Sequence, residues 1–376
     1  MEQKARLKPL KIGTLTANYP VIQGGMGVGI SLSSLAGAVA KAGGIGIIST
    51  AQIGFKRPEF EKNPLEANLK AIHDELAKAR KLAPEGILGF NIMVATKEYG
   101  QYVKAAVKAG ADVIISGAGL PIDMPKFVSE AEETTVENRR TMLAPIVSSA
   151  KSAMVICRMW DRKHKTAPDF VVIEGPCAGG HLGFSEDQLT EFGADTKSVS
   201  KTYKQSKYEE EIRSIINTVK EFADKYKKEI PVIVAGGVYD HADVLRQLEL
   251  GADGVQVATR FVTTEECDAD TAYKQAYIHA KEEDIVIVKS PVGMPGRAIK
   301  NRFLEQVQEG KIPVTRCFRC LAHCNPAETP YCITKALINA AEGNVDEALL
   351  FCGSNAYRST KIETVSDVMK ELCGDV

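Results

Sequence analysis

PVIVAGG, residues 231–237, is an apolar stretch rich in β-branched side chains that ends on two glycines. The stretch VIISGAG, residues 113–119, has the same character. Continuous apolar runs are typical of parallel strands buried on both faces, whereas strands with one face in water alternate apolar and polar residues. Both stretches therefore predict buried parallel strands that end in tight turns.

Similar segments recur along the chain, and helix-like amphipathic stretches lie between most of them. We expect eight strands, at Val21–Met26, Gly44–Thr50, Ile87–Met93, Asp112–Gly117, Ala144–Ser149, Phe170–Gly175, Pro231–Gly237 and Gly254–Phe261. Eight such strands with helical crossovers indicate the α/β class and favour a closed (β/α)8 TIM barrel. The Gly, Ser, Asn, Glu and His residues gather at the strand ends, where barrels place their chemistry.

An open, doubly wound sheet is the main alternative, and its dinucleotide fingerprint is G-x-G-x-x-G. The stretch GGMGVGIS, residues 24–31, has the register G-x-G-x-G instead, at Gly25, Gly27 and Gly29. An acidic residue at the spacing that a ribose partner needs is also missing from the sequence. These differences favour the barrel.

Two segments interrupt the strand and helix rhythm. Residues 182–208 are rich in charged residues, Ser and Thr, and we expect an insertion after strand six that covers the active site. From about residue 301 a cysteine-rich segment leads into helix-like stretches at Thr334–Glu342 and Val365–Leu372. We therefore expect a barrel over residues 1–300 and a C-terminal extension over residues 301–376.

Composition narrows the class of function. The hydrophobic content of 44% and charged content of 25% are typical of soluble globular proteins, and the apolar runs are too short for a membrane span. The first residues do not resemble an export signal, so we expect a cytoplasmic protein with reduced thiols. A net charge of −1 with interspersed signs argues against a nucleic-acid partner and favours small-molecule chemistry.

The ends of strands seven and eight predict a phosphate site. Ala235-Gly236-Gly237 and Val257-Ala258-Thr259 fall where many barrels hold a phosphate between backbone N–H groups and a helix N-terminus. A pair of glycines alone is as well explained by a tight turn, but the neighbouring GADGVQVATRF strengthens the prediction. Gly24-Gly25-Met26 offers a nearly bare backbone for a flat ring, and Asn91 offers an amide.

His181 is the strongest candidate for a catalytic residue. It ends the stretch Glu174-Gly175-Pro176-Cys177-Ala178-Gly179-Gly180-His181, just beyond a barrel strand. A histidine placed there can act as a general acid or base near neutral pH. The other histidines lack such a setting, and we interpret them as surface or loop residues.

Four cysteines lie within sixteen residues, as Cys317-x2-Cys320-x3-Cys324-x7-Cys332. Thiolates at such spacing can wrap one metal centre, either zinc or an iron–sulfur cluster. Their compact, asymmetric arrangement differs from paired zinc knuckles and favours a cluster, while free thiols in a loop are the plain alternative. A basic stretch at residues 151–165 is either a solvated helix face or a surface for an acidic carrier protein.

The motifs QGGMG, SGAGLP, EGPCAGGH, AGG and GVQVATRF resemble, in order, those of the nitronate monooxygenase and enoyl-[acyl-carrier-protein] reductase II superfamily of FMN barrels. GGMGVGIS, Met124-Pro125, Lys289-Ser290-Pro291-Val292-Gly293, the cysteines and Asn355-Ala356-Tyr357-Arg358 extend the resemblance. With them the chain is most similar to the flavin and [4Fe–4S] dehydrogenase/isomerases of unsaturated fatty-acid synthesis. The cysteine spacings here are shorter than in that group.

This resemblance implies FMN and a [4Fe–4S] cluster as cofactors, with His181 as the catalytic base and the four cysteines as ligands. The cofactor-binding residues would be Gly24, Gly25, Met26, Asn91, Glu174, Gly180, Ala235, Gly236, Gly237, Gln256, Ala258, Thr259 and Lys289. Lys289 would stabilise the reduced flavin if its ammonium group faced the ring, and an exposed lysine is the alternative interpretation.

The implied reaction is dehydrogenation of an acyl-carrier-protein thioester with isomerisation of the double bond from trans-2 to cis-3. His181 would remove the α-proton while a hydride leaves to flavin N5. Oxidation of alkyl nitronates with O2 and NAD(P)H-dependent enoyl reduction are alternatives that need no cluster. A redox sensor on a degenerate barrel is an alternative of another class. The expected partner is an acyl-carrier protein or another acyl thioester, and a homodimer is one possible assembly.

Overall fold

In the computed structural model, residues 7–134, 140–195 and 205–375 are described. Eight parallel strands close into a barrel in chain order. They are β3 (Val21–Gln23), β4 (Ile45–Ser49), β5 (Ile87–Met93), β6 (Val113–Gly117), β7 (Met142–Val147), β8 (Val171–Glu174), β10 (Val232–Ala235) and β11 (Gly254–Val257). The predicted TIM barrel is therefore confirmed. The eighth strand ends earlier than predicted, because the backbone leaves the extended conformation at Ala258 and residues Thr259–Val262 form helix α9.

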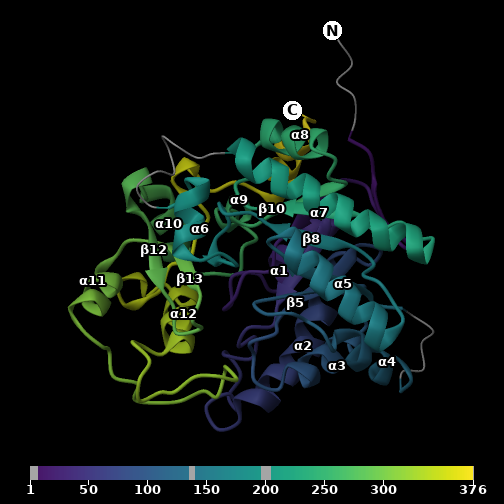
Figure 1. The fold of residues 1–376 in the computed structure, drawn as a ribbon. Coiled ribbons are helices and arrows are strands. Elements are labelled where there is room, and N and C mark those ends of the chain that lie inside the picture. The colour runs from purple at the N-terminus through teal and green to yellow at the C-terminus, as the bar shows by residue number, and fades with distance from the viewer. Residues whose placement is uncertain (1–6, 135–139, 196–204, 376) are drawn as a thin grey trace.

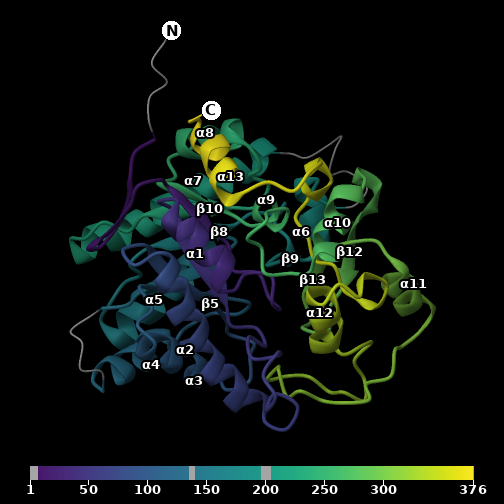
Figure 2. The same ribbon diagram turned by 180° about the vertical axis from the view of Figure 1, so that it is seen from behind.

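Helices cover the outside of the barrel (Figure 1). They are α1 (Ser33–Lys41), α2 (Pro64–Leu82), α3 (Tyr99–Lys108), α4 (Met124–Glu132), α5 (Ala150–His164), α7 (Gln205–Tyr226), α8 (His241–Glu249) and α13 (Val365–Cys373). Helix α13, which the sequence predicts, contacts α1 and α8 and thus completes the ring of helices (Figure 2). The C-terminal segment is therefore part of the barrel wall.

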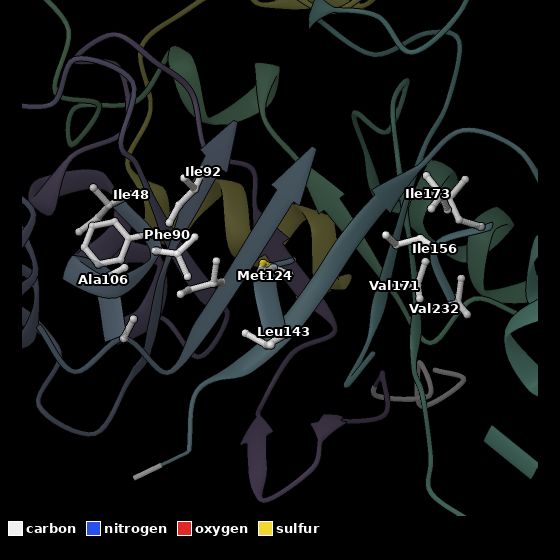
Figure 3. Close-up of a cluster of buried hydrophobic side chains, with 14 of the residues drawn as sticks. Ile48, Phe90, Ile92, Ala106, Met124, Leu143, Ile156, Val171, Ile173 and Val232 are labelled. Carbon is white, nitrogen blue, oxygen red and sulfur yellow. The ribbon is translucent and has the colours of Figure 1, made fainter. Parts of the chain in front are cut away.

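Burial on both faces explains the continuous apolar runs. Every residue of β4 and of β6 is buried. One cluster of apolar side chains fills the barrel interior, where the hairpin of β1 (Leu10–Ile12) and β2 (Leu15–Ala17) adds Leu10 and Ile12. A larger cluster joins the strands to the surrounding helices, with Phe90 and Ile92 of β5 among its members (Figure 3).

A second, antiparallel sheet lies beside the barrel (Figures 1 and 2). Its strands follow the order β12 (Ile285–Lys289), β13 (Pro295–Ile299) and β9 (Gly180–His181). Helices α6 (Glu186–Phe192), α10 (Thr271–His279), α11 (Arg302–Glu309) and α12 (Ile333–Ala341) complete this part of the molecule. The sequence pattern did not predict this sheet, since β9 has only two residues and pairs with a strand more than 100 residues away.

The described residues include only part of the predicted insertion and most of the predicted C-terminal extension. Residues 196–204 of the insertion lie outside the described residues, and its described part holds α6 and the start of α7. The predicted helix at Thr334–Glu342 corresponds to α12. Among the helices that the structure describes, none combines the length and apolar character needed to cross a membrane.

The beginning of α1 depends on a residue more than 200 positions away in the sequence. Oδ1 and Oδ2 of Asp268 accept hydrogen bonds from the backbone N–H groups of Leu32, Ser34 and Leu35, at 2.7 to 3.2 Å. The first residues of α1 have no side-chain cap of their own. Asp268 therefore joins the first helix to the segment that follows β11.

We expect Asp268→Ala to lower the free energy of unfolding by at least about 2 kcal/mol, because three buried N–H groups lose their acceptor. Asn63→Ala is the matched control, since it removes an exposed cap that serves one N–H group of α2 and should cost about 1 kcal/mol. Urea titration of both variants measures the difference. Equal losses in the two variants would contradict the role given to Asp268.

Candidate active site

A cavity of about 250 Å³ lies at the carboxyl ends of the barrel strands. Each of the eight strands, or the turn that follows it, contributes a lining residue: Gly24, Ser49, Asn91, Gly117, Ile146, Glu174, Ala235 and Gln256. The second part of the molecule forms the opposite wall, with Tyr273 and Tyr277 of α10, Leu337 of α12, and Phe351. The cavity is thus enclosed between the barrel and the segments beside it.

The predicted catalytic residue and the predicted FMN-binding residues come together in this cavity, with one exception. The lining includes His181 and, among the predicted cofactor contacts, Gly24, Gly25, Met26, Asn91, Glu174, Gly180, Ala235, Gly236, Gly237, Gln256, Ala258 and Thr259. Lys289 is not part of the lining. It is exposed at the end of β12, the strand of the second sheet that is farthest from β9, which matches its interpretation as an exposed lysine.

Bare glycine backbone shapes the barrel side of the cavity. A Cβ atom at Gly25 would lie 2.4 Å from Cβ of Asn91, so a side chain cannot be accommodated there. Gly236 has a φ of +95°, which favours glycine, and a Cβ atom there would lie 2.9 Å from the backbone nitrogen of Ala178. Both positions therefore require glycine, because neighbouring protein atoms occupy the space that a side chain would need.

Gln256 provides a direct indication of a missing ligand. Its Oε1 atom is buried and has no hydrogen-bond partner among the residues that the structure describes, although the residue lines the cavity. Buried polar atoms in native proteins are almost always hydrogen-bonded. A ligand that offers an N–H or O–H group at this position would satisfy it.

His181 lies on the second sheet, where β9 places it opposite Gly296 of β13. Its Nε2 atom is 2.6 Å from Oγ of Ser290, and its ring packs edge-on against Phe351 with centroids 4.9 Å apart. Burial lowers the pKa of His181 to about 4. The imidazole is therefore neutral at physiological pH and able to accept a proton. The sequence offered a signal for Ser290, in the motif Lys289–Gly293, but no role.

Glu174, at the end of β8, is a second titratable group in the cavity. Burial raises its pKa to about 7, although the carboxylate accepts a hydrogen bond from the N–H group of Gly183 at 2.8 Å and lies near the positive charge of Arg297. At neutral pH this residue is divided between its acid and carboxylate forms. The cavity therefore combines a neutral imidazole with a carboxyl group that can exchange protons.

The segment at residues 353–355 completes the predicted phosphate site, although the sequence pattern did not indicate its contacts there. The N–H group of Gly353 donates to Oγ1 of Thr259 at 2.9 Å, and the amide nitrogen of Asn355 donates to the carbonyl of Gly237 at 2.8 Å. Gly353, Ser354 and Asn355 also line the cavity. The turns after β10 and β11 are thus held in place from the C-terminal side.

The four cysteines lie in one segment outside this cavity. The segment pairs with the loop after β5, where Lys97 N–H donates to the carbonyl of Cys320 and Ala322 N–H donates to that of Ala95, both at 3.0 Å. Burial, with Cys332 and Cys324 nearby, raises the pKa of Cys320 to about 11. Among the described residues, no group of three or more His, Cys, Asp or Glu side chains is arranged to hold a metal ion.

Comparison with known proteins agrees with this architecture. A family model described as nitronate monooxygenase matches residues 8–375. The chain is 27% identical over 320 residues to a probable nitronate monooxygenase of Staphylococcus saprophyticus, covering 79% of this chain and 80% of that protein. FabK from Thermotoga maritima has a similar structure, with a TM-score of 0.66, 23% identity, and coverage of 96% and 93% of the two chains. A nitroalkane oxidase from Streptomyces ansochromogenes shares the fold at 17% identity, with a TM-score of 0.66 and 95% of each chain covered.

We expect the ring of His181 to remain neutral from pH 8 down to about pH 5, because burial disfavours its charged form. NMR of protein labelled with ¹³C-histidine, with the signal assigned by a His181→Gln variant, measures this. An unfolded chain takes up this proton near pH 6.5 and the folded chain only near pH 4, so the group destabilises the fold as the pH falls through that range. A titration of His181 near pH 6.5 would show that the site is open to water.

Proposed function

The chain belongs to the nitronate monooxygenase family, and from this premise we propose that it is an FMN-dependent dehydrogenase and isomerase of acyl thioesters. The family makes it an oxidoreductase. The observation that carries the choice of substrate is the buried, neutral His181 in the cavity. Removal of an α-proton needs a base, whereas a nitronate is already a carbanion, and a neutral imidazole beside Glu174 offers an anion no attraction.

The residues of the cavity fit FMN. The turns at Gly236-Gly237 and Thr259 would hold the phosphate, since they lie where (β/α)8 barrels bind phosphate groups. The bare backbone at Gly24–Met26 would face the ring, and the unpartnered Oε1 of Gln256 would accept from a ring N–H group. When bound, FMN would supply the two-electron acceptor for the hydride that leaves the β-carbon.

His181, oriented by Ser290, would carry out the proton transfers of the proposed reaction. In the tautomer that donates Nε2–H to Oγ of Ser290, Nδ1 carries the lone pair that takes the α-proton. After releasing that proton, the same imidazole would remove a proton from carbon four and return one at carbon two, which shifts the double bond from trans-2 to cis-3. Glu174 would donate a hydrogen bond to the enolate oxygen in its acid form, which its raised pKa keeps populated near neutral pH.

Oxidation of nitronates is the second candidate function. It is favoured by the 27% identity to a probable nitronate monooxygenase over most of both chains. Such a reaction would use the same FMN and the same cavity, with O2 as the electron acceptor. NAD(P)H-dependent enoyl reduction is the reverse of the first proposed half-reaction and would use the same residue, His181, as the acid that protonates the α-carbon.

We further propose that Cys317, Cys320, Cys324 and Cys332 bind one metal centre, a [4Fe–4S] cluster in preference to zinc. The donor chemistry supports this, because the segment carries four thiols, and burial together with repulsion from Cys317 and Cys332 raises the pKa of Cys324. The N–H group of Arg319 also donates to Sγ of Cys317 at 3.4 Å, a contact that stabilises a thiolate. A bound cluster would supply a one-electron carrier. An acyl-carrier protein is the proposed source of the thioester.

We expect His181→Ala to retain FMN but to lose thioester-driven flavin reduction by at least roughly 10²-fold, the contribution typical of a general base. Anaerobic stopped-flow mixing with acyl-carrier thioesters and, separately, with alkyl nitronates follows the bleaching of the flavin. His73→Ala is the control, because His73 is an exposed residue of α2.

Unchanged bleaching by thioesters in the His181→Ala protein would assign proton abstraction to another group. Bleaching of the wild-type flavin by nitronates but not by any thioester would replace the proposed reaction with nitronate oxidation.

Protein prepared without oxygen should contain about four irons and four acid-labile sulfides per chain, as a cubane held by four cysteines requires. Cys320→Ala should lose the metal and destabilise its segment, because ligation energy is also folding energy. Cys157→Ala is the control, since Cys157 is buried in α5 away from that segment. A single zinc ion per chain would indicate a tetrahedral site, and the absence of both metals would remove the proposed centre.

A further inference from the structure

Among the residues that the structure describes, Arg297 has the least exposed charged side chain, with no accessible surface. It belongs to β13, next to Gly296, and its backbone pairs with Gly180 of β9. From there its guanidinium group reaches the loop between β8 and β9, which carries His181 at its end. Nη1 donates to the carbonyl of Pro176 at 3.0 Å and to the carbonyl of Ala178.

The loop between β8 and β9 has little to hold it in place by itself. Two of its residues, Gly175 and Gly179, are glycines, and a third glycine, Gly180, begins β9; glycines lose much conformational freedom when fixed. Partners from outside bind three consecutive carbonyls of this loop. Arg297 binds those of Pro176 and Ala178, and Ser354 N–H donates to the one between them, at Cys177.

The same guanidinium group also binds the segment that follows α6. Nη2 donates to the carbonyl of Ala194 at 2.5 Å. One side chain therefore joins three parts of the chain: the second sheet, the loop before His181, and the insertion after it. A guanidinium suits this task because its N–H groups lie in a rigid planar fork, whereas the ammonium group of a lysine is a compact point donor.

We propose that Arg297 is a positioning residue, which fixes the loop between β8 and β9 so that His181 faces the cavity in its reactive orientation. The proposal rests on the proposed function, in which His181 is the base. Arg297 acts through the backbone, whereas Ser290 and Phe351 contact the imidazole directly. Without the fork, the carbonyls of Pro176 and Ala178 lose their donor, and only the bond from Ser354 N–H to Cys177 still holds this part of the loop from outside.

Arg297→Met and Arg297→Lys test this role in the FMN-loaded protein. Methionine removes both the charge and the fork, whereas lysine keeps the charge but not the fork. Arg80→Met is the matched control, because Arg80, in the last turn of α2, also donates to backbone carbonyls, those of Pro84 and Gly86 in the turn before β5.

We expect both Arg297 variants to bind FMN and to lose kcat by roughly 10- to 100-fold with little change in KM, since small misplacements of a catalytic group have effects of this size. A second readout does not depend on activity. Diethylpyrocarbonate modification of His181, followed by peptide mass spectrometry, should be faster in both variants than in the wild type. Arg80→Met should change neither quantity.

Unchanged kcat and unchanged modification of His181 in a folded Arg297→Met protein would overturn the proposal. Full activity in Arg297→Lys would show that charge suffices and would overturn the role of the fork. Failure of both variants to fold or to retain FMN would assign Arg297 to stability alone. If none of the tested thioesters reduces the flavin of the wild type, the proposed function fails. The modification rate of His181 still decides the role of Arg297 in that case.

Discussion

The pairing of β9 with β13 is the contact on which the rest of the site depends. It places His181 opposite Gly296 and Gly180 opposite Arg297, across more than 100 residues of chain. The barrel alone provides a rim of glycines and amides, as many barrels do. The second sheet adds the imidazole to this rim and closes the cavity on the side opposite the barrel. The chemistry of the site therefore needs both the barrel and the second sheet.

Enclosure also sets the protonation states of the cavity. Burial lowers the pKa of His181 and raises that of Glu174, so that near neutral pH one group can accept a proton while the other exchanges one. In water the imidazole would be partly charged and the carboxyl group fully ionised. The C-terminal segment maintains this enclosure through Gly353 and Asn355, and its helix α13 is anchored by Arg260, which binds Glu363 and Glu371.

Local patterns in the sequence were sufficient to predict the barrel, because its strands are short, mostly apolar segments such as residues 113–117. They also located Gly236, which follows directly on β10, while the resemblance to known motifs added Gln256 within β11. Contacts between distant segments left no such signal. The two-residue strand β9, the cap that Asp268 provides for α1, and the bond of Ser290 to His181 all join segments far apart in sequence. The exposed position of Lys289 could not be predicted either, because it follows from the strand order of the second sheet, in which β12 lies at the edge away from β9.

The central claim is that the cavity between the barrel and the second sheet holds FMN. The most direct measurement is the flavin content of the purified protein, obtained by denaturing it and identifying the released chromophore. The account predicts a yellow protein that releases about one FMN per chain, as a site for a single resident cofactor requires. A colourless protein that fails to take up added FMN would contradict it.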